Sequence, residues 1–342
     1  MKGHFATLFS VLVYTLKNNY LIFVYIFIPL LMQKYQNISY IPPLLFIPIT
    51  ILLIVLLPKK IGEIEYSKIL KKSFIAKYSY YVVQVLMLIL NIIIVSYTIR
   101  IMFFYDENII PFILSAILVT IFISNNKIEV IFNSSSFLLL IAIILIIIPV
   151  FLATDVKDFT LLMPLNDFKG FSFLLLFYFI LDAISIVLSG ANIKKKLSKW
   201  HLLIPIIIML IFMSLELVNI IIITGDTYLI NNEFLGFFTL FIQDTINYIG
   251  NLGLFFLYVI PVVGCFKAGY ALRKIKDAFN IGNSLFANTL LLIILFFIIF
   301  GLIYFVEIPM FSYIVIFLST ILLSIVYVFI IINRSRNYEI KF

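Results

Sequence analysis

Charged and amide side chains interrupt two stretches of the chain that are otherwise apolar. Lys17, Asn18 and Asn19 lie in the run VYTLKNNYLIFVY, and Asp182 lies in FYFILDAISIVLSG. A charge near the centre of a bilayer costs about 2.5 to 3.5 kcal/mol on insertion scales, so it usually marks a functional site or an ion pair between helices. We therefore expect Lys17 to pair with Asp182 across a central cavity, while the two amides satisfy backbone groups at a helix break. The alternative is an ion pair that serves packing alone.

Further polar residues occur at depths suited to a solute site. Glu216 is either a proton-titrating group or a hydrogen-bonded residue that stabilises the bundle. Gln84 and Asn91 share one helix face, because they are seven residues apart. Taken singly, such residues are more often interhelical hydrogen-bonding groups than ligand contacts. Lys267 and Arg273 are expected to snorkel to the membrane interface. The predicted ligand-binding residues are Lys17, Asn18, Asn19, Gln84, Asn91, Asp182, Ser185, Asn251 and Gly253, and the candidates for proton or ion coupling are Asp182 and Glu216.

The composition of the whole chain is that of a membrane protein. Hydrophobic residues make up 64% of the 342 residues, the mean hydropathy is +1.21, and only 12% of the residues are charged. The charges gather in short clusters between apolar runs of about 20 residues, the length that crosses a bilayer. We therefore predict an all-α polytopic membrane protein. The first apolar run has no small-residue cleavage site, so we expect it to stay in the mature protein.

The apolar runs between charge clusters predict about ten transmembrane helices. With the N-terminus inside, 18 of the 24 lysines and arginines lie on the inner flank and three on the outer flank, which instead carries nine acidic residues. This bias places both termini in the cytoplasm. The expected spans are 5–32, 41–57, 80–103, 109–124, 135–153, 170–190, 202–223, 249–272, 289–306 and 311–332.

The predicted spans divide into two halves of opposite orientation, residues 1–153 and 154–342, within a single transmembrane domain. This pattern predicts a 5+5 inverted-repeat (LeuT-like) arrangement, in which substrate binds near the midplane where the first helix of each half is interrupted. The polar interruptions at 17–19 and at Asp182 fall in corresponding places. Residues 224–249 are too polar to span the membrane but keep apolar residues at helical spacing. They are expected to form an amphipathic helix on the outer face or an ordinary surface loop.

Groups that bind metals or perform covalent chemistry are scarce. Cys265 is the only cysteine, and His4 and His201 are the only histidines, so no cluster has metal-ligand spacing. The sequence contains no phosphate-binding glycine loop, nucleophile elbow or catalytic-triad pattern. We expect no cofactor and no enzymatic activity, and we expect Cys265 to be a packing residue. The net charge of +8 is interpreted as a topology signal rather than as nucleic-acid binding.

Three stretches match the order and spacing of segments in one family of membrane proteins. They are LLPKKIGEIEYSKILKKSF (56–74) after the second span, SNNKIEVIFNSSSFLLLI (124–141) at the entry to the fifth, and LLMPLNDFKGF (161–171) before the sixth. In these stretches the chain resembles the spore germination permeases, the integral B subunits of the nutrient germinant receptors of spore-forming Gram-positive bacteria. That family belongs to the amino acid-polyamine-organocation superfamily. The first span departs from it, since the family usually has small, glycine-containing residues where this chain has residues 17–19.

The resemblance implies a function and partners. It implies a subunit in the bacterial cell membrane or spore inner membrane that binds a small solute, such as an amino acid, and signals germination. The implied partners are a membrane A subunit and a lipoprotein C subunit. Spans one, three, six and eight surround the site in the superfamily. Because a fold does not fix a function, a proton- or sodium-coupled secondary transporter of amino acids or related solutes is the alternative, and a structural subunit is a third reading.

Overall fold

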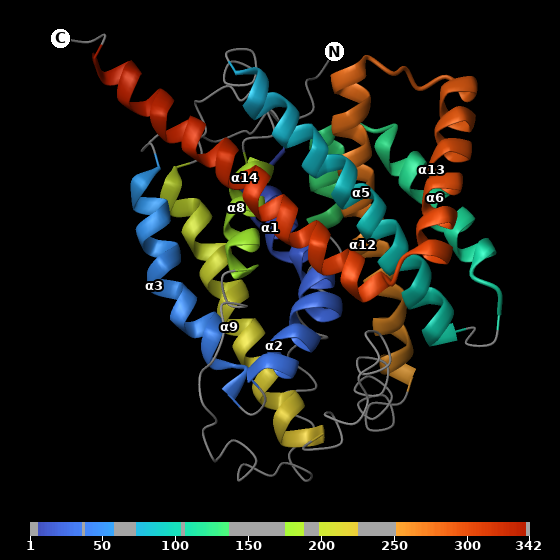
Figure 1. Ribbon diagram of the computed structural model, residues 1–342, viewed down its shortest axis with the longest axis horizontal. Coiled ribbons are helices and arrows are strands. Elements are labelled where there is room, and N and C mark those ends of the chain that lie inside the picture. Colours follow the sequence, from blue (N-terminus) through green and yellow to red (C-terminus); the bar gives the residue numbers. More distant parts are fainter. Residues whose placement is uncertain are drawn as a thin grey trace.

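The computed structural model describes residues 6–35, 38–57, 73–103, 107–136, 175–187, 198–224 and 251–339. Every regular element within these ranges is a helix, as predicted for an all-α protein (Figure 1). The helices are α1 (Leu8–Ile22), η1 (Phe23–Phe27), α2 (Ile28–Tyr35), α3 (Ile41–Leu56), α5 (Phe74–Phe103), α6 (Ile110–Ser124), a short helix (Ile128–Ser136), α8 (Phe177–Val187), α9 (Lys199–Thr224), α12 (Asn251–Phe279), α13 (Leu285–Phe305) and α14 (Ile308–Glu339).

Several of these helices have the length and composition of membrane spans. Within the described residues, four helices meet both criteria, and they are α5, α9, α13 and α14. The helix Ile128–Ser136 follows α6 at a bend of 114°, and this pair would make a fifth span if it crosses as one unit. Such long apolar helices are those of a membrane-embedded protein. The expected span 135–153 and the outer segment 224–249 lie almost wholly outside the described residues.

The helix ends expected on the inner flank gather at one end of the molecule. At the top of Figure 1, α3, α6 and α12 end, while α5, α9 and α13 begin. This end carries Lys127, Lys199, Lys274 and Lys276. Two of these lysines also join helices, because Lys199 Nζ donates to the Val55 carbonyl in the last turn of α3 at 2.8 Å and Lys276 Nζ donates to the amide oxygens of Asn125, Asn283 and Asn288 at 2.7, 3.5 and 2.9 Å. At the basic end, these bonds therefore join α3 to α9, and α12 to the end of α6 and the start of α13.

Helix α12 packs closely against α5 and α6. A Cβ atom on Gly269 would lie 2.5 Å from Cγ2 of Ile123, so the glycine permits the backbone of α12 to approach α6. Beside it, the rings of Tyr14, Phe132 and Tyr270 form a mutual cluster with centroid separations of 4.6, 5.5 and 5.8 Å. These contacts fix the position of α12 against three neighbouring segments, in the manner of small-residue and aromatic packing between membrane helices.

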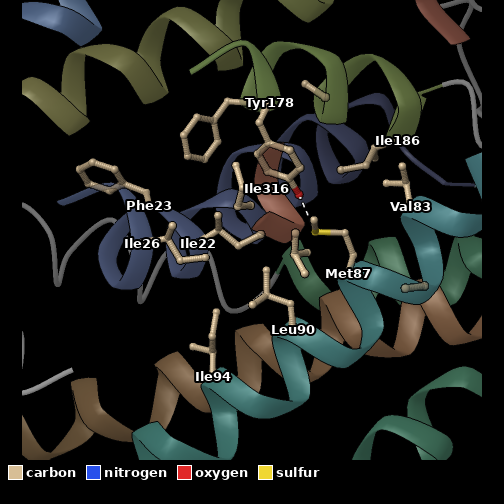
Figure 2. Close-up of a cluster of buried hydrophobic side chains, with 14 of the residues drawn as sticks. Ile22, Phe23, Ile26, Val83, Met87, Leu90, Ile94, Tyr178, Ile186 and Ile316 are labelled. Carbon is tan, nitrogen blue, oxygen red and sulfur yellow. Dashed lines mark hydrogen bonds between the residues drawn. The ribbon is translucent and has the colours of Figure 1, made fainter. Parts of the chain in front are cut away.

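An apolar core lies where α8 faces α5. Figure 2 shows Tyr178 of α8 pointing toward Met87 of α5, surrounded by apolar side chains that include Ile22 and Phe23 from the first helical segment and Ile316 of α14. The Tyr178 hydroxyl donates to the Met87 sulfur at 3.0 Å. All five residues are almost completely buried. A polar tyrosine tip is thus held at a defined point within an apolar interior.

The expected helix break at residues 17–19 is wrong, because α1 continues through them to Ile22 and the irregular turn is the π-helix η1 that follows. Thr15 Oγ1 donates to the Val11 carbonyl at 2.9 Å, and Asn19 Nδ2 contacts the Thr15 carbonyl at 3.5 Å. These side chains add bonds to carbonyls one turn back instead of replacing the helical ones. The polar residues therefore do not break α1, and the change of helical pitch occurs at Phe23–Phe27.

Candidate functional site

A buried ion pair lies at the centre of the bundle. Lys267 Nζ of α12 lies 3.0 Å from Asp182 Oδ2 of α8, and each side chain is only 5% exposed. The same ammonium donates to the Asn19 amide oxygen at 2.6 Å and to the Tyr178 hydroxyl at 3.0 Å. An ammonium group has three hydrogens, so each one has an acceptor here. Lys267 is thereby bound by side chains from α1 and α8 together.

Helix α8 supplies two of these contacts from one face. Tyr178 and Asp182 are four residues apart, and such residues are neighbours on a helix surface. The Tyr178 ring centroid lies 5.3 Å from Lys267 Nζ, which adds a cation–π contact to the hydrogen bond. Because the hydroxyl accepts from Lys267 and donates to the Met87 sulfur, its orientation is fixed by α12 and α5. The site therefore joins α1, α5, α8 and α12.

The pair is deep in the molecule. Lys267 is about 12 residues from the end of α12 at Phe279, a distance of ~18 Å along a helix. Asp182 is in the middle of α8. Moving two ions out of water is costly, and their attraction offsets this cost only when the geometry is good and further hydrogen bonds satisfy the charges. The three partners of Lys267 provide such compensation, so the two opposite charges are stable together at this depth.

The cation that the structure describes beside Asp182 is Lys267, and the expected pairing of Asp182 with Lys17 stays a prediction. The side chains of Lys17 and Asn18 lie outside the described residues, although their backbone is part of α1. The expectation that Lys267 snorkels to the interface is wrong. The physical reason is packing, since Asp182, Asn19 and Tyr178 bind the ammonium and leave only 5% of the Lys267 side chain exposed.

Three other predicted site residues lie on the helices α5 and α8 that contribute to this site. Ser185 Oγ donates to the backbone carbonyl of Asp182 at 2.8 Å. Gln84 and Asn91 are buried on the face of α5 that also carries Met87. Asn91 Nδ2 donates to the Met87 carbonyl at 2.7 Å, and Asn91 Oδ1 has no hydrogen-bond partner among the described residues. The α5 residues therefore place a polar stripe beside the Tyr178 contact.

The remaining candidates are placed less closely or lie outside the described side chains. Glu216 is buried on α9, and no contact of its carboxylate with the central pair is recorded within the described residues. Asn251 and Gly253 belong to the first turn of α12, some 14 residues or more from Lys267, and their side-chain surroundings are outside the described part. Cys265 is buried, as expected of a packing residue.

Sequence reasoning missed two members of the site. They are Lys267, the partner of Asp182, and Tyr178, which contacts both α5 and α12. A signal for Tyr178 was present, because it precedes Asp182 by four residues and so shares its helix face. For Lys267 the only signal was its position inside the expected span 249–272, five residues from its end. Pairing between α8 and α12 depends on tertiary packing, so no local pattern indicates it.

The site combines a cation, an anion, an amide and a phenol in an apolar interior. Such groups can recognise the charged ends of a small polar solute, and the carboxylate can exchange protons. The described residues contain no group of three or more histidine, cysteine, aspartate or glutamate side chains that would hold a metal ion. No model of a known protein family matches this chain, and no curated protein matches it either.

Proposed function

We propose that this protein is a membrane subunit of a spore nutrient-germinant receptor that binds a small solute, such as an amino acid, near the membrane midplane. The observation that carries the proposal is the Asp182–Lys267 pair, bound by Asn19 and Tyr178 where α1, α8 and α12 meet. The step from a solute-binding membrane protein to a germinant receptor rests on the resemblance of the three sequence stretches, and it carries with it the A and C subunits as partners.

The charges of the pair match those of an amino acid. A ligand carboxylate would bind Lys267 and a ligand ammonium would bind Asp182, so the ligand would replace one ion pair by two. After this exchange every buried charge still has a partner. A buried charge left without one is the main cost of opening such a pair. Asn91 on α5 offers a further buried acceptor close to the Met87 backbone.

The alternative function is a proton- or sodium-coupled secondary transporter of amino acids or related solutes. It is favoured by the buried carboxylate of Asp182, because ionisable groups at this depth are typical of ion-coupled carriers. Both functions share the proposed arrangement of about ten spans in two inverted halves, in a bacterial cell membrane or spore inner membrane, with both termini in the cytoplasm.

Gene deletion in the source bacterium tests the receptor function. Spores that lack the protein are expected to lose germination with a subset of nutrients in an amino-acid and sugar panel, and the wild-type gene should restore it. A gene carrying Lys267→Met should not restore it at equal protein level, whereas Asp277→Asn, at an exposed ion pair on the same helix, should restore it fully. Normal germination of the deletion strain with every nutrient would refute the receptor function.

Purified protein in lipid vesicles tests the alternative. Uptake of a labelled amino acid that depends on the protein and on a proton or sodium gradient would identify a carrier. A receptor subunit is instead expected to bind the solute without net uptake, and to co-purify from spores with two companion proteins. The two outcomes separate the two functions.

A further inference from the structure

The three side chains around the Lys267 ammonium present oxygens to it and direct their own hydrogens elsewhere. The hydrogen of the Tyr178 hydroxyl is donated to the Met87 sulfur at 3.0 Å, so the hydroxyl oxygen is left to accept from Lys267. The Asn19 amide nitrogen faces a backbone carbonyl of its own helix at 3.5 Å, and its amide oxygen accepts from Lys267. An ionised Asp182 carboxylate has acceptors only. These side chains are therefore arranged for a positively charged donor.

Asp182, Asn19 and Tyr178 together form an ammonium cage. Their oxygens lie 3.0, 2.6 and 3.0 Å from Lys267 Nζ. Asn19 and Tyr178 are completely buried and Asp182 is 4% exposed, so protein groups and not bulk water must satisfy the three oxygens. An acceptor buried without a donor is costly, and a buried charge without a counter-charge is more so. The cage therefore needs an occupant with a positive charge and three hydrogens, and Lys267 of α12 supplies it.

Three acceptors match the three hydrogens of a primary ammonium group. An N-methyl ammonium has one hydrogen fewer and a quaternary ammonium has none, so each added methyl group leaves one cage oxygen without a donor. A methyl group also needs room, and apolar side chains that include Ile22 and Ile316 pack around Tyr178 (Figure 2). The cage therefore distinguishes a primary amine from its methylated forms by hydrogen-bond count and by size.

We propose that the ammonium cage recognises the amino group of the solute, and that Lys267 occupies the cage as a built-in competitor until the solute displaces it. The proposal rests on the proposed solute-binding function and adds its selectivity, because the solute must carry a primary ammonium next to a carboxylate. Asn19 and Tyr178 are then specificity-determining residues, since each accepts one hydrogen of that ammonium. The proposal applies equally to a receptor and to a carrier.

The exchange of one ammonium for another keeps every charge paired. The solute ammonium enters the cage and pairs with Asp182, while Lys267 withdraws on its flexible four-carbon stem and pairs with the solute carboxylate. In an α-amino acid both charged groups are attached to one carbon, so Lys267 stays beside the cage. A simple amine has no carboxylate and would leave the displaced Lys267 without a partner in the interior. The wild-type protein should therefore reject simple amines, which gives the site its selectivity for amino acids.

Truncation of the lysine tests the cage with a defined probe. In Lys267→Ala the missing atoms, Cγ to Nζ, are those of n-propylammonium. We expect this amine to raise the unfolding temperature of the purified full-length variant in detergent in a saturable manner, and to leave that of the wild type unchanged. N-methyl-n-propylammonium should bind the variant about tenfold more weakly, because one buried oxygen loses its donor. The trimethylated amine should not bind at all.

Removal of one cage oxygen tests the selectivity. Added to Lys267→Ala, the change Tyr178→Phe keeps the ring and leaves two acceptors, which N-methyl-n-propylammonium can satisfy fully. The preference for the primary amine should therefore fall about tenfold, to near equality. If Tyr178 served packing alone, both amines would weaken together and the preference would remain. The same ratio is measured with Lys267 in place, for the amino acid that binds best in a panel and its N-methyl derivative, so the test does not depend on the folding of Lys267→Ala.

The matched control is Ile299→Ala on α13, which removes a side chain at a fully buried position of the apolar core and leaves no cage of oxygens. No amine should stabilise it. Equal stabilisation of this control by n-propylammonium, or none of Lys267→Ala, would overturn the cage. The amino-acid panel on the wild type reports the proposed function separately. Amino-acid binding without amine binding to Lys267→Ala refutes only the cage, whereas amine binding to Lys267→Ala with no amino acid bound by the wild type refutes the proposed ligand class.

Discussion

At the scale of single residues, the Asp182–Lys267 pair determines which substitutions in the interior lower the stability of the protein. Asp182→Asn leaves the Lys267 ammonium without its counter-ion, and Lys267→Met leaves the Asp182 carboxylate without one. Breaking a buried pair by removing one partner costs about 3 to 5 kcal/mol, because the other charge is left uncompensated. We therefore expect each single variant to unfold at a clearly lower temperature in detergent. The double variant should regain most of the loss, since no buried charge remains.

An exposed pair on the same helix provides the control for this prediction. Arg273 and Asp277 form an i,i+4 contact of 2.9 Å, with side chains that are 23% and 44% exposed. Asp277→Asn should lower stability by only about 0.3 to 0.5 kcal/mol, because water screens such a pair. If Asp182→Asn or Lys267→Met costs no more than this control, the central pair is solvated and the account of the site is wrong.

Single residues also show what the sequence can and cannot predict about the site. The depth of Asp182 and its need for a cation follow from the cost of a charge in an apolar span. The pairing with Lys267 does not follow, because a contact between distant helices depends on tertiary packing. Asn19 was predicted as an amide that repairs a helix break, but its oxygen accepts from Lys267 at 2.6 Å instead.

At the scale of helices, the close approach of α12 to α6 positions the site, and Gly269 permits it. In Gly269→Ala the new methyl group would lie 2.5 and 2.7 Å from Cγ2 and Cβ of Ile123, so one helix must move. Overpacking of this kind costs about 1 to 3 kcal/mol. Because Gly269 lies between Lys267 and Tyr270, a displacement of α12 should also weaken solute binding. Thermal unfolding and an amino-acid binding assay measure the two effects.

The matched change is Gly301→Ala in α13, where a Cβ atom would meet nothing within 4 Å. An alanine is favoured over glycine within a helix by about 1 kcal/mol, so this variant should be as stable as the wild type or more so. Equal behaviour of the two variants would show that the α6–α12 contact adjusts without cost.

Helix boundaries show where sequence patterns work and where they fail. The expected spans 41–57 and 109–124 agree with α3 (Ile41–Leu56) and α6 (Ile110–Ser124), since hydrophobic runs bounded by prolines or polar residues mark both ends. The expected spans 80–103 and 249–272 are shorter than α5 (Phe74–Phe103) and α12 (Asn251–Phe279). An apolar run measures the thickness of the hydrocarbon region, whereas a helix continues beyond it. The apolar runs therefore underestimate the lengths of both helices.

At the scale of the whole molecule, charge and fold agree on which helix ends lie together. The ends of α6 and α12 and the start of α13 share one end of the molecule, where Lys276 Nζ donates to Asn125 and Asn288. Repeated alternation of charge along the chain made this grouping predictable, because successive membrane helices reverse direction. That α1, α5, α8 and α12 pack around one site could be predicted only from the family resemblance. Contacts between distant helices leave no local pattern in the sequence.

The same grouping predicts how the chain is oriented in the membrane. Glu107 and Asn126 are exposed at opposite ends of α6, so cysteines at these positions report opposite sides. In a Cys265→Ala background, a membrane-impermeant thiol reagent should label Glu107→Cys in intact cells. It should label Asn126→Cys only after the cells are permeabilised, because the positive-inside rule places that end in the cytoplasm. Since Lys276 donates to the neighbouring Asn125 at 2.7 Å, the result also assigns a side to the end of α12. Labelling of Asn126→Cys in intact cells would invert the orientation, and labelling of both positions would show that α6 does not cross the membrane.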